Sequence, residues 1–101
     1  MVAITRSRWV TGQVLKQHQW TTRLFSLQIE VALDSFKAGQ FIRLQLPVED
    51  NGEFKLIAKS YSLVNAPHNP VAEIFYNIVP NGKLSNALAQ LQEGDAIDVS
   101  Q

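Results

Sequence analysis

Apolar and polar residues alternate along much of this chain. Phe25, Leu27, Ile29 and Val31 are separated by single residues, and the same period of two recurs over 42–46 and 74–79. A strand with this period places its apolar side chains on one face and its polar side chains on the other. The sequence therefore predicts strands that are each half buried against a common core.

Three further strands complete the predicted set. They are expected around 9–16, 57–64 and 96–100, and Pro47 is expected to end the strand that begins near Phe41. Segments rich in glycine, proline, asparagine or aspartate separate the strands, at 38–39, 50–52, 67–70, 80–82 and 93–95.

One segment follows a helical period instead. Leu84, Leu88 and Leu91 recur at spacings of four and three, which predicts a short amphipathic helix from about Leu84 to Gln92, ended by Gly94 as a glycine C-cap. The pattern as a whole predicts an all-β fold. We expect a six-stranded antiparallel Greek-key barrel with one short capping helix between strands 5 and 6, because closure protects exposed strand edges.

Composition narrows the functions that the chain can have. Nine basic and nine acidic residues cancel, so no net charge favours nucleic acid or an anionic membrane. The absence of cysteine excludes disulfides, thiolate metal sites and cysteine nucleophiles. His18 and His68 lack the spacing of metal ligands, so no metal site is predicted. Without a membrane-spanning run or a signal peptide, the default expectation is a cytoplasmic protein.

Two segments indicate a site for a flat cofactor that carries phosphate. Lys59-Ser60-Tyr61-Ser62 places a cation, a ring and hydroxyls on one strand, with Lys59 and Tyr61 on one face and Ser62 on the other or at the rim. The segment 79–85 is a turn that opens the helix, whose first N–H groups and positive dipole end suit an anion. A tyrosine ring can stack on a tricyclic ring, and lysines can bind a diphosphate.

The same residues have simpler explanations. Tyr61 can be a packing residue, Ser85 can cap its own helix, and Lys83 can be a solvated lysine beside a turn. Gly82 is required by the turn whether or not a ligand binds. Five carboxylates are expected to be solvated: Asp34, Glu53, Glu73, Glu93 and Asp95. The two tryptophans, Trp9 and Trp20, are expected to be packing residues.

Lys59-Ser60-Tyr61-Ser62 resembles the Arg-x-Tyr-Ser/Thr motif of the ferredoxin–NADP reductase superfamily. Six blocks are similar, in the same order, to the bacterial ferredoxin (flavodoxin)–NADP reductases: 9–12, 20–27, 38–41, 61–67, 79–85 and 93–95. The resemblance covers almost the whole chain. It implies that residues 1–101 form the N-terminal FAD-binding barrel domain of such an enzyme.

The resemblance also implies a role for each candidate residue. Tyr61 matches the tyrosine that lies against the isoalloxazine, and Ser62 matches the hydroxyl residue near flavin N5, so these two are the expected catalytic residues. Lys59, next to Ser60, stands where the family has an arginine on the pyrophosphate. The remaining expected FAD contacts are a strand whose main chain pairs with the pyrimidine edge and a helix start that binds the diphosphate: Tyr76, Asn77, Ile78 and Val79, and Lys83, Leu84 and Ser85.

The chain departs from the family pattern at two points. Lysine at position 59 cannot form the planar bidentate pair that arginine forms with phosphate, so we expect either weaker FAD binding or a different position of the diphosphate. FAD is preferred over FMN on the resemblance alone. Family members also continue into a nucleotide-binding domain, so we expect an excised domain that is inactive with NADPH by itself. NADP(H) is expected to bind only through that second domain, with ferredoxin or flavodoxin as the electron partner.

Two other interpretations stay open at this point. The first is a non-catalytic barrel that binds an oligonucleotide or a protein partner, with exposed Trp, Phe and Lys stacking on and pairing with bases. The zero net charge argues against nucleic acid. The second is a different flavin-dependent electron-transfer module that shares the same barrel.

Overall fold

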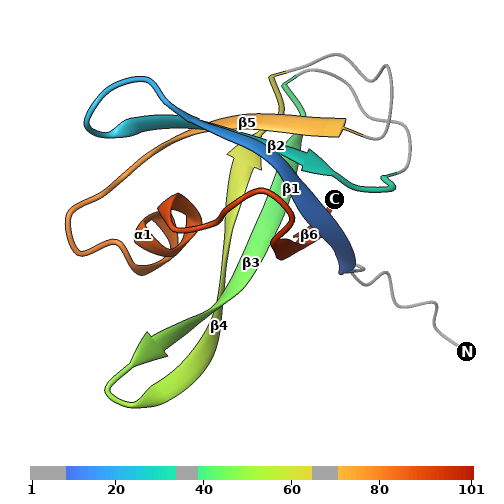
Figure 1. Cartoon of the computed structure of the whole chain (residues 1–101). Helices are drawn as coiled ribbons and strands as arrows, with labels where there is room; N and C mark the ends of the chain where they lie inside the picture. Colours follow the sequence, from blue (N-terminus) through green and yellow to red (C-terminus); the bar gives the residue numbers. More distant parts are fainter. Residues whose placement is uncertain (1–8, 34–38, 65–70) are drawn as a thin grey trace, which may run out of the picture.

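The computed structural model describes residues 9–33, 39–64 and 71–101, so the predicted turn at 67–70 with His68 lies outside the described residues. Six strands and one helix follow one another along the chain, in the order shown in Figure 1: β1 (Val10–Gln19), β2 (Leu24–Glu30), β3 (Phe41–Asp50), β4 (Glu53–Ser62), β5 (Val71–Asn77), α1 (Lys83–Ala89) and β6 (Ala96–Ser100). The predicted helix between the fifth and sixth strands is confirmed.

All six strands form one antiparallel sheet in the order β4-β3-β6-β1-β2-β5. The last strand of the chain is thus inserted between β1 and β3. The sheet curls (Figure 1) until Leu63, just past β4, forms a bridge with Ile74 of β5. Beside this bridge the Val64 N–H donates to the Glu73 carbonyl at 2.9 Å. The curled sheet confirms the all-β barrel fold.

The core fills the inside of the curl, and α1 covers it from one side (Figure 1). Alternate residues of the strands point inward, as the period of two predicted. Leu84 and Leu88 of α1 are completely buried against them. The inward-facing strand residues are Val14, Phe25, Leu27, Ile29, Ile42, Leu44, Leu46, Ala72, Ile74, Tyr76, Ile97 and Val99.

Several predicted element boundaries differ from the structure. The strands expected around 9–16 and 57–64 span Val10–Gln19 and Glu53–Ser62. Pro47 does not end its strand but lies inside β3, where it pairs with Leu56 of β4. Because β6 pairs with β3 only at 43–45, residue 47 has a neighbouring strand on one side only, and proline is tolerated at such a position. The helix stops at Ala89 with Gln90 as its C-cap, and Gly94 (φ 93°) instead turns the chain into β6. The strand expected over 74–79 spans Val71–Asn77.

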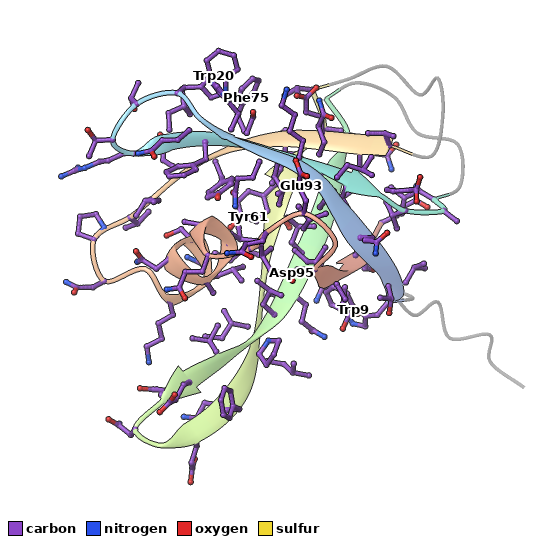
Figure 2. All side chains as sticks on the ribbon, in the orientation of Figure 1. Trp9, Trp20, Tyr61, Phe75, Glu93 and Asp95 are labelled. Carbon is purple, nitrogen blue, oxygen red and sulfur yellow. The ribbon has the colours of Figure 1, made fainter. Side chains whose placement is uncertain are left out.

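Trp20, which was expected to be a packing residue, lies outside the core. Its side chain is 56% exposed, on the side of the sheet that faces away from α1 (Figure 2). The ring meets His18 edge-on at a centroid distance of 4.2 Å and lies 6.3 Å from Phe75. Its indole N–H donates to Ser26 Oγ at 3.0 Å, which satisfies the polar end of the ring. Trp9 is half buried beneath the Arg43 guanidinium, 4.9 Å from the ring centroid.

A substitution at Gly12 tests how tightly β1 packs against β2. A Cβ at this position would lie 2.7 Å from Ile29 Cγ2 and 3.0 Å from Val31 Cβ, so Gly12→Ala forces the sheet apart. We expect the free energy of unfolding, measured by urea denaturation, to fall by about 1–3 kcal/mol. Gln13→Ala, at the exposed neighbouring position, is the control. Equal stability of the two variants would contradict the tight packing at Gly12.

Candidate functional site

The end of β4 carries the first group of predicted site residues. Lys59 pairs with Leu44 and Tyr61 with Ile42, and both partners are buried, so Lys59 and Tyr61 share the inner face as predicted. Ser60 and Ser62 alternate with them on the outer face and are exposed. β4 lies at one end of the sheet order, so this segment is also close to an open edge of the sheet.

Tyr61 belongs to a small aromatic group beneath the sheet. Its half-buried ring packs against the core on the side where α1 lies (Figure 2). It meets the ring of Tyr76 edge-on, at a centroid distance of 6.4 Å and an interplanar angle of 74°. Tyr76 in turn stacks on Phe25 at 5.5 Å. Burial raises the pKa of Tyr61, so its hydroxyl is neutral and the ring presents a flat, uncharged wall.

The second group, Tyr76 to Val79, runs from the end of β5 into a turn. Asn77 is the last strand residue and pairs with Leu24. The Ile78 N–H donates to the Arg23 carbonyl at 2.8 Å, and the Val79 N–H donates to Ser85 Oγ at 3.1 Å. Two of the main-chain donors expected to face a flavin are therefore used inside the protein, which leaves the exposed Asn77 as the most accessible polar residue of this group.

The turn before α1 has little room for a side chain. Gly82 has an ordinary φ of −76°, but a Cβ there would lie 2.9 Å from the Val79 carbonyl oxygen. The Gly82 N–H donates to that same carbonyl at 2.7 Å and closes the turn, in which Asn81 adopts a left-handed φ of 64°. Gly82 is thus required by the turn itself, as expected, because of space and not because of its φ.

Ser85 does not cap its own helix, contrary to one of the two sequence-based interpretations. The N-cap is Gly82, which makes no side-chain cap bond, and the buried Ser85 hydroxyl accepts the Val79 N–H instead. Leu84 is fully buried in the core. What these two residues can offer an anion is therefore their main-chain N–H groups, since the first N–H groups of a helix have no partner within it.

Lys83 is paired with an acid of the segment 50–52, which the sequence pattern indicated only as a break between strands. Its ammonium lies 2.5 Å from Asp50 Oδ2, at the end of β3, and Lys55 lies 3.9 Å from the same oxygen. The hydrogen bond and charge of Lys83 lower the pKa of Asp50. The stabilisation from this ion pair is therefore present above the ordinary carboxyl pKa and is lost as the pH falls through the lowered value.

A cleft of about 480 Å³ lies where the β3–β4 hairpin faces the start of α1. Of the predicted site residues only Lys83 lines it; its other walls are Pro47, Val48, Glu49, Asn81, Gly82, Asn86, Ala87 and Gln90. Lys59 forms no ion pair within residues 9–33, 39–64 and 71–101 and remains available to an anion.

These residues fall in a definite order along the inner face of β4. Tyr61 comes first, Lys59 lies two residues further along, and Lys55 follows beside the Asp50–Lys83 pair. Two residues of a strand span about 7 Å. A ring wall, a cation without an ion pair among the described residues and a second cationic end thus lie in one row along β4.

No three His, Cys, Asp or Glu side chains in the described part of the chain lie close enough together to hold a metal ion. No helix among these residues is both long and apolar enough to cross a membrane.

Known proteins match this chain over most of its length. A family model described as the oxidoreductase FAD-binding domain matches residues 13–100. Flavodoxin/ferredoxin–NADP reductase of Escherichia coli (strain K12) is 45% identical over 91 residues, or 90% of this chain and 35% of that protein. The enzyme of the same name from Buchnera aphidicola subsp. Schizaphis graminum is 42% identical over 98 residues, or 92% of this chain and 38% of that protein.

A solved structure agrees with these matches. The ferredoxin NADP+ reductase of Neisseria gonorrhoeae, crystallised with bound FAD and NADP, superposes with a TM-score of 0.79 at 29% identity, over 94% of this chain and 37% of that one. The chain thus spans little more than a third of the length of these relatives. Since the family model covers nearly all of it, the chain belongs to the oxidoreductase FAD-binding domain family and is similar to the N-terminal part of the ferredoxin/flavodoxin–NADP reductases.

Proposed function

We propose that this chain holds FAD within a ferredoxin/flavodoxin–NADP reductase-like oxidoreductase. The observation that supports this most strongly is the order of groups along the inner face of β4. A half-buried, neutral tyrosine ring is followed by a lysine that has no ion pair in the described part of the chain, and then by the cationic end where the hairpin meets α1. A flat ring that carries a diphosphate needs this order of contacts.

Each side chain has a distinct part in this proposal. Tyr61 provides the wall against which the isoalloxazine stacks, and Lys59 binds the pyrophosphate. Ser62 lies on the opposite face at the exposed end of β4, where its hydroxyl would serve as a hydrogen-bond donor near flavin N5. The pyrimidine edge lies along the end of β5 at Tyr76 and Asn77, with Ile78 and Val79 shaping the turn.

The diphosphate end is built by the start of α1. Lys83 contributes its charge, while Leu84 and Ser85 contribute main-chain N–H groups. Ser60 lies on the face of β4 opposite Tyr61 and Lys59, and its main chain holds these two residues in position. The seven-residue helix is short, so we assign the binding to these local donors and not to the dipole of a long helix.

FAD, when bound, supplies hydride exchange with NADPH and single-electron exchange with a ferredoxin or flavodoxin. The residues described here bind and orient the cofactor and keep water from one side of its ring. In this proposal NADP(H) binds to a second domain outside these 101 residues, so the chain alone does not turn over NADPH. We also propose a cytoplasmic setting for the complete enzyme, with no nucleic acid or membrane partner.

The primary test is the visible absorbance of the purified chain after incubation with excess FAD and desalting. We expect retained flavin absorbance in the wild type and at least about tenfold weaker binding in Tyr61→Ala and Lys59→Ala, because stacking and a charge-assisted contact are lost. Phe54→Ala, an exposed aromatic of the same strand, and Lys16→Ala, an exposed lysine of β1, are the matched controls. A wild type that retains no flavin, or controls that lose it equally, would contradict the proposal.

Lys59→Arg tests the departure from the family motif. An arginine binds phosphate through two parallel N–H donors, so we expect FAD affinity to rise by about three- to tenfold. Fluorescence titration of FAD with wild type and variant measures the difference. Unchanged or weaker binding would place the diphosphate away from residue 59.

Asp50→Asn tests whether the Asp50 carboxylate competes with the diphosphate for Lys83. Removing this acid leaves Lys83 free, so we expect FAD to bind a few-fold more tightly at low salt and the advantage to shrink as salt screens the charges. The same titration at two ionic strengths measures it. Glu49→Gln, which lines the cleft without pairing to Lys83, is the control. Weaker binding by Asp50→Asn would show that Asp50 orients Lys83 instead of competing for it.

A further inference from the structure

A polar side chain, Gln17, lies where β1, β5 and α1 meet. Its amide nitrogen Nε2 donates to the Leu91 carbonyl at 2.8 Å and to the Leu88 carbonyl at 3.1 Å, at the end of the helix. Its amide oxygen Oε1 accepts the hydroxyl of Tyr76, on β5. One glutamine side chain of β1 is therefore hydrogen-bonded to β5 and to the end of α1, both of which are far from it in sequence.

A β-bulge in β1 is what turns Gln17 inward. Val14 pairs with Ile29, but the next paired residue is Lys16, opposite Gln28, so Leu15 is the extra residue. Without this shift, Lys16 would follow Val14 on the inner face. With it, Lys16 points outward and Gln17 pairs with the buried Leu27. Bulges often re-aim a side chain next to a functional site.

The hydrogen bonds fix which way the Gln17 amide points. Both amide protons go to carbonyl oxygens, which can only accept, so the remaining atom facing Tyr76 is the amide oxygen. The Tyr76 hydroxyl must then be the donor. Burial, and to a lesser degree Tyr61, raises the pKa of Tyr76, so this hydroxyl keeps its proton near neutral pH.

Tyr76 connects these hydrogen bonds to Tyr61, the proposed stacking wall for the flavin. Its ring is only 3% exposed and is held on one side by the stacked ring of Phe25. On another side it meets Tyr61 edge-on. With the hydroxyl fixed by Gln17 and the ring fixed by Phe25, Tyr76 has little freedom to rotate, and neither has the Tyr61 ring that rests against it.

We propose that Gln17 is a positioning residue for the FAD site, which couples helix α1 to the stacking wall of Tyr61 through the Tyr76 hydroxyl. The inference rests on the proposed function. It ties the two ends of the site together, because the helix whose start offers the diphosphate donors is held at its other end by the side chain that sets the aromatic wall. Gln17 does not touch the cofactor in this account and acts only through Tyr76 and α1.

The chain offers a direct readout, because Tyr61 and Tyr76 are its only tyrosines. In a sample labelled on its tyrosine rings, Tyr76→Phe leaves the Tyr61 signal alone and so assigns both resonances. The variants are Gln17→Leu, Tyr76→Phe and the two combined. Gln13→Leu is the control, since Gln13 lies on the same strand and donates to the Gly94 carbonyl without touching Tyr76.

For Gln17→Leu we expect a shifted Tyr61 ring signal in the FAD-free chain and about tenfold weaker FAD binding, as the loss of such hydrogen bonds implies. Tyr76→Phe should weaken binding similarly, and the combined variant should add little, because both changes break one connection. Gln13→Leu should change neither quantity. If Gln17→Leu does not fold, Tyr76→Phe still tests the connection, since it removes a single hydroxyl.

The possible failures are distinguishable. A wild-type chain that binds no FAD overturns the proposed function, and this inference with it, before any variant is compared. A wild type that binds FAD, together with a Gln17→Leu variant that binds equally well and keeps the Tyr61 signal in place, overturns the inference alone. Fully additive losses in the combined variant also overturn it, since Gln17 would then act independently of Tyr76.

Discussion

The apolar inner face of a single sheet must be shielded from water, and the rest of this structure follows from how that is done. The sheet curls until Leu63, just past β4, forms a bridge with Ile74 in the middle of β5, and α1 closes the remaining side with Leu84 and Leu88. A helix of seven residues is not stable alone, so its position is dictated by this burial. The turn that precedes it, and with it Lys83, is therefore placed by the core.

Most polar groups near the candidate site already form hydrogen bonds or ion pairs within the protein, so few of them remain available to a ligand. The Ser85 hydroxyl holds the Val79 N–H, and Asn86 donates to the Gly82 carbonyl at 2.6 Å, so the turn is rigid without any ligand. What remains is a tyrosine ring, a lysine that forms no ion pair with the described residues, an exposed asparagine and the first N–H groups of α1. A site of this kind is preorganised, which lowers the entropy lost when a cofactor binds.

Local patterns predicted the elements, whereas contacts across the fold could not be predicted. The period of two identified the buried residues from Phe25 to Val31, and the leucine spacing identified the helix, because both patterns reflect burial of one face. The bulge at Leu15 left no signal in residue type, so Gln17 was missed. The Asp50–Lys83 pair joins residues far apart in sequence, and Asp50 was read only as part of a turn. The match of Tyr61 to a stacking residue came from the family motif, since a tyrosine on a strand indicates packing equally well.

The place of β4 at the end of the sheet order has a consequence for the solution behaviour of the chain. Between Glu53 and Ser60 its outer edge pairs with no strand of the described residues, and Phe54 and Leu56 on it are 72% and 65% exposed. Such an edge is a template for pairing between molecules. Charged Glu53, Lys55 and Lys59 alternate with the apolar residues and make that pairing unfavourable. Lys59 thus disfavours aggregation in addition to any part in cofactor binding. A substitution that changes the charge along this edge is expected to affect solubility more than the fold.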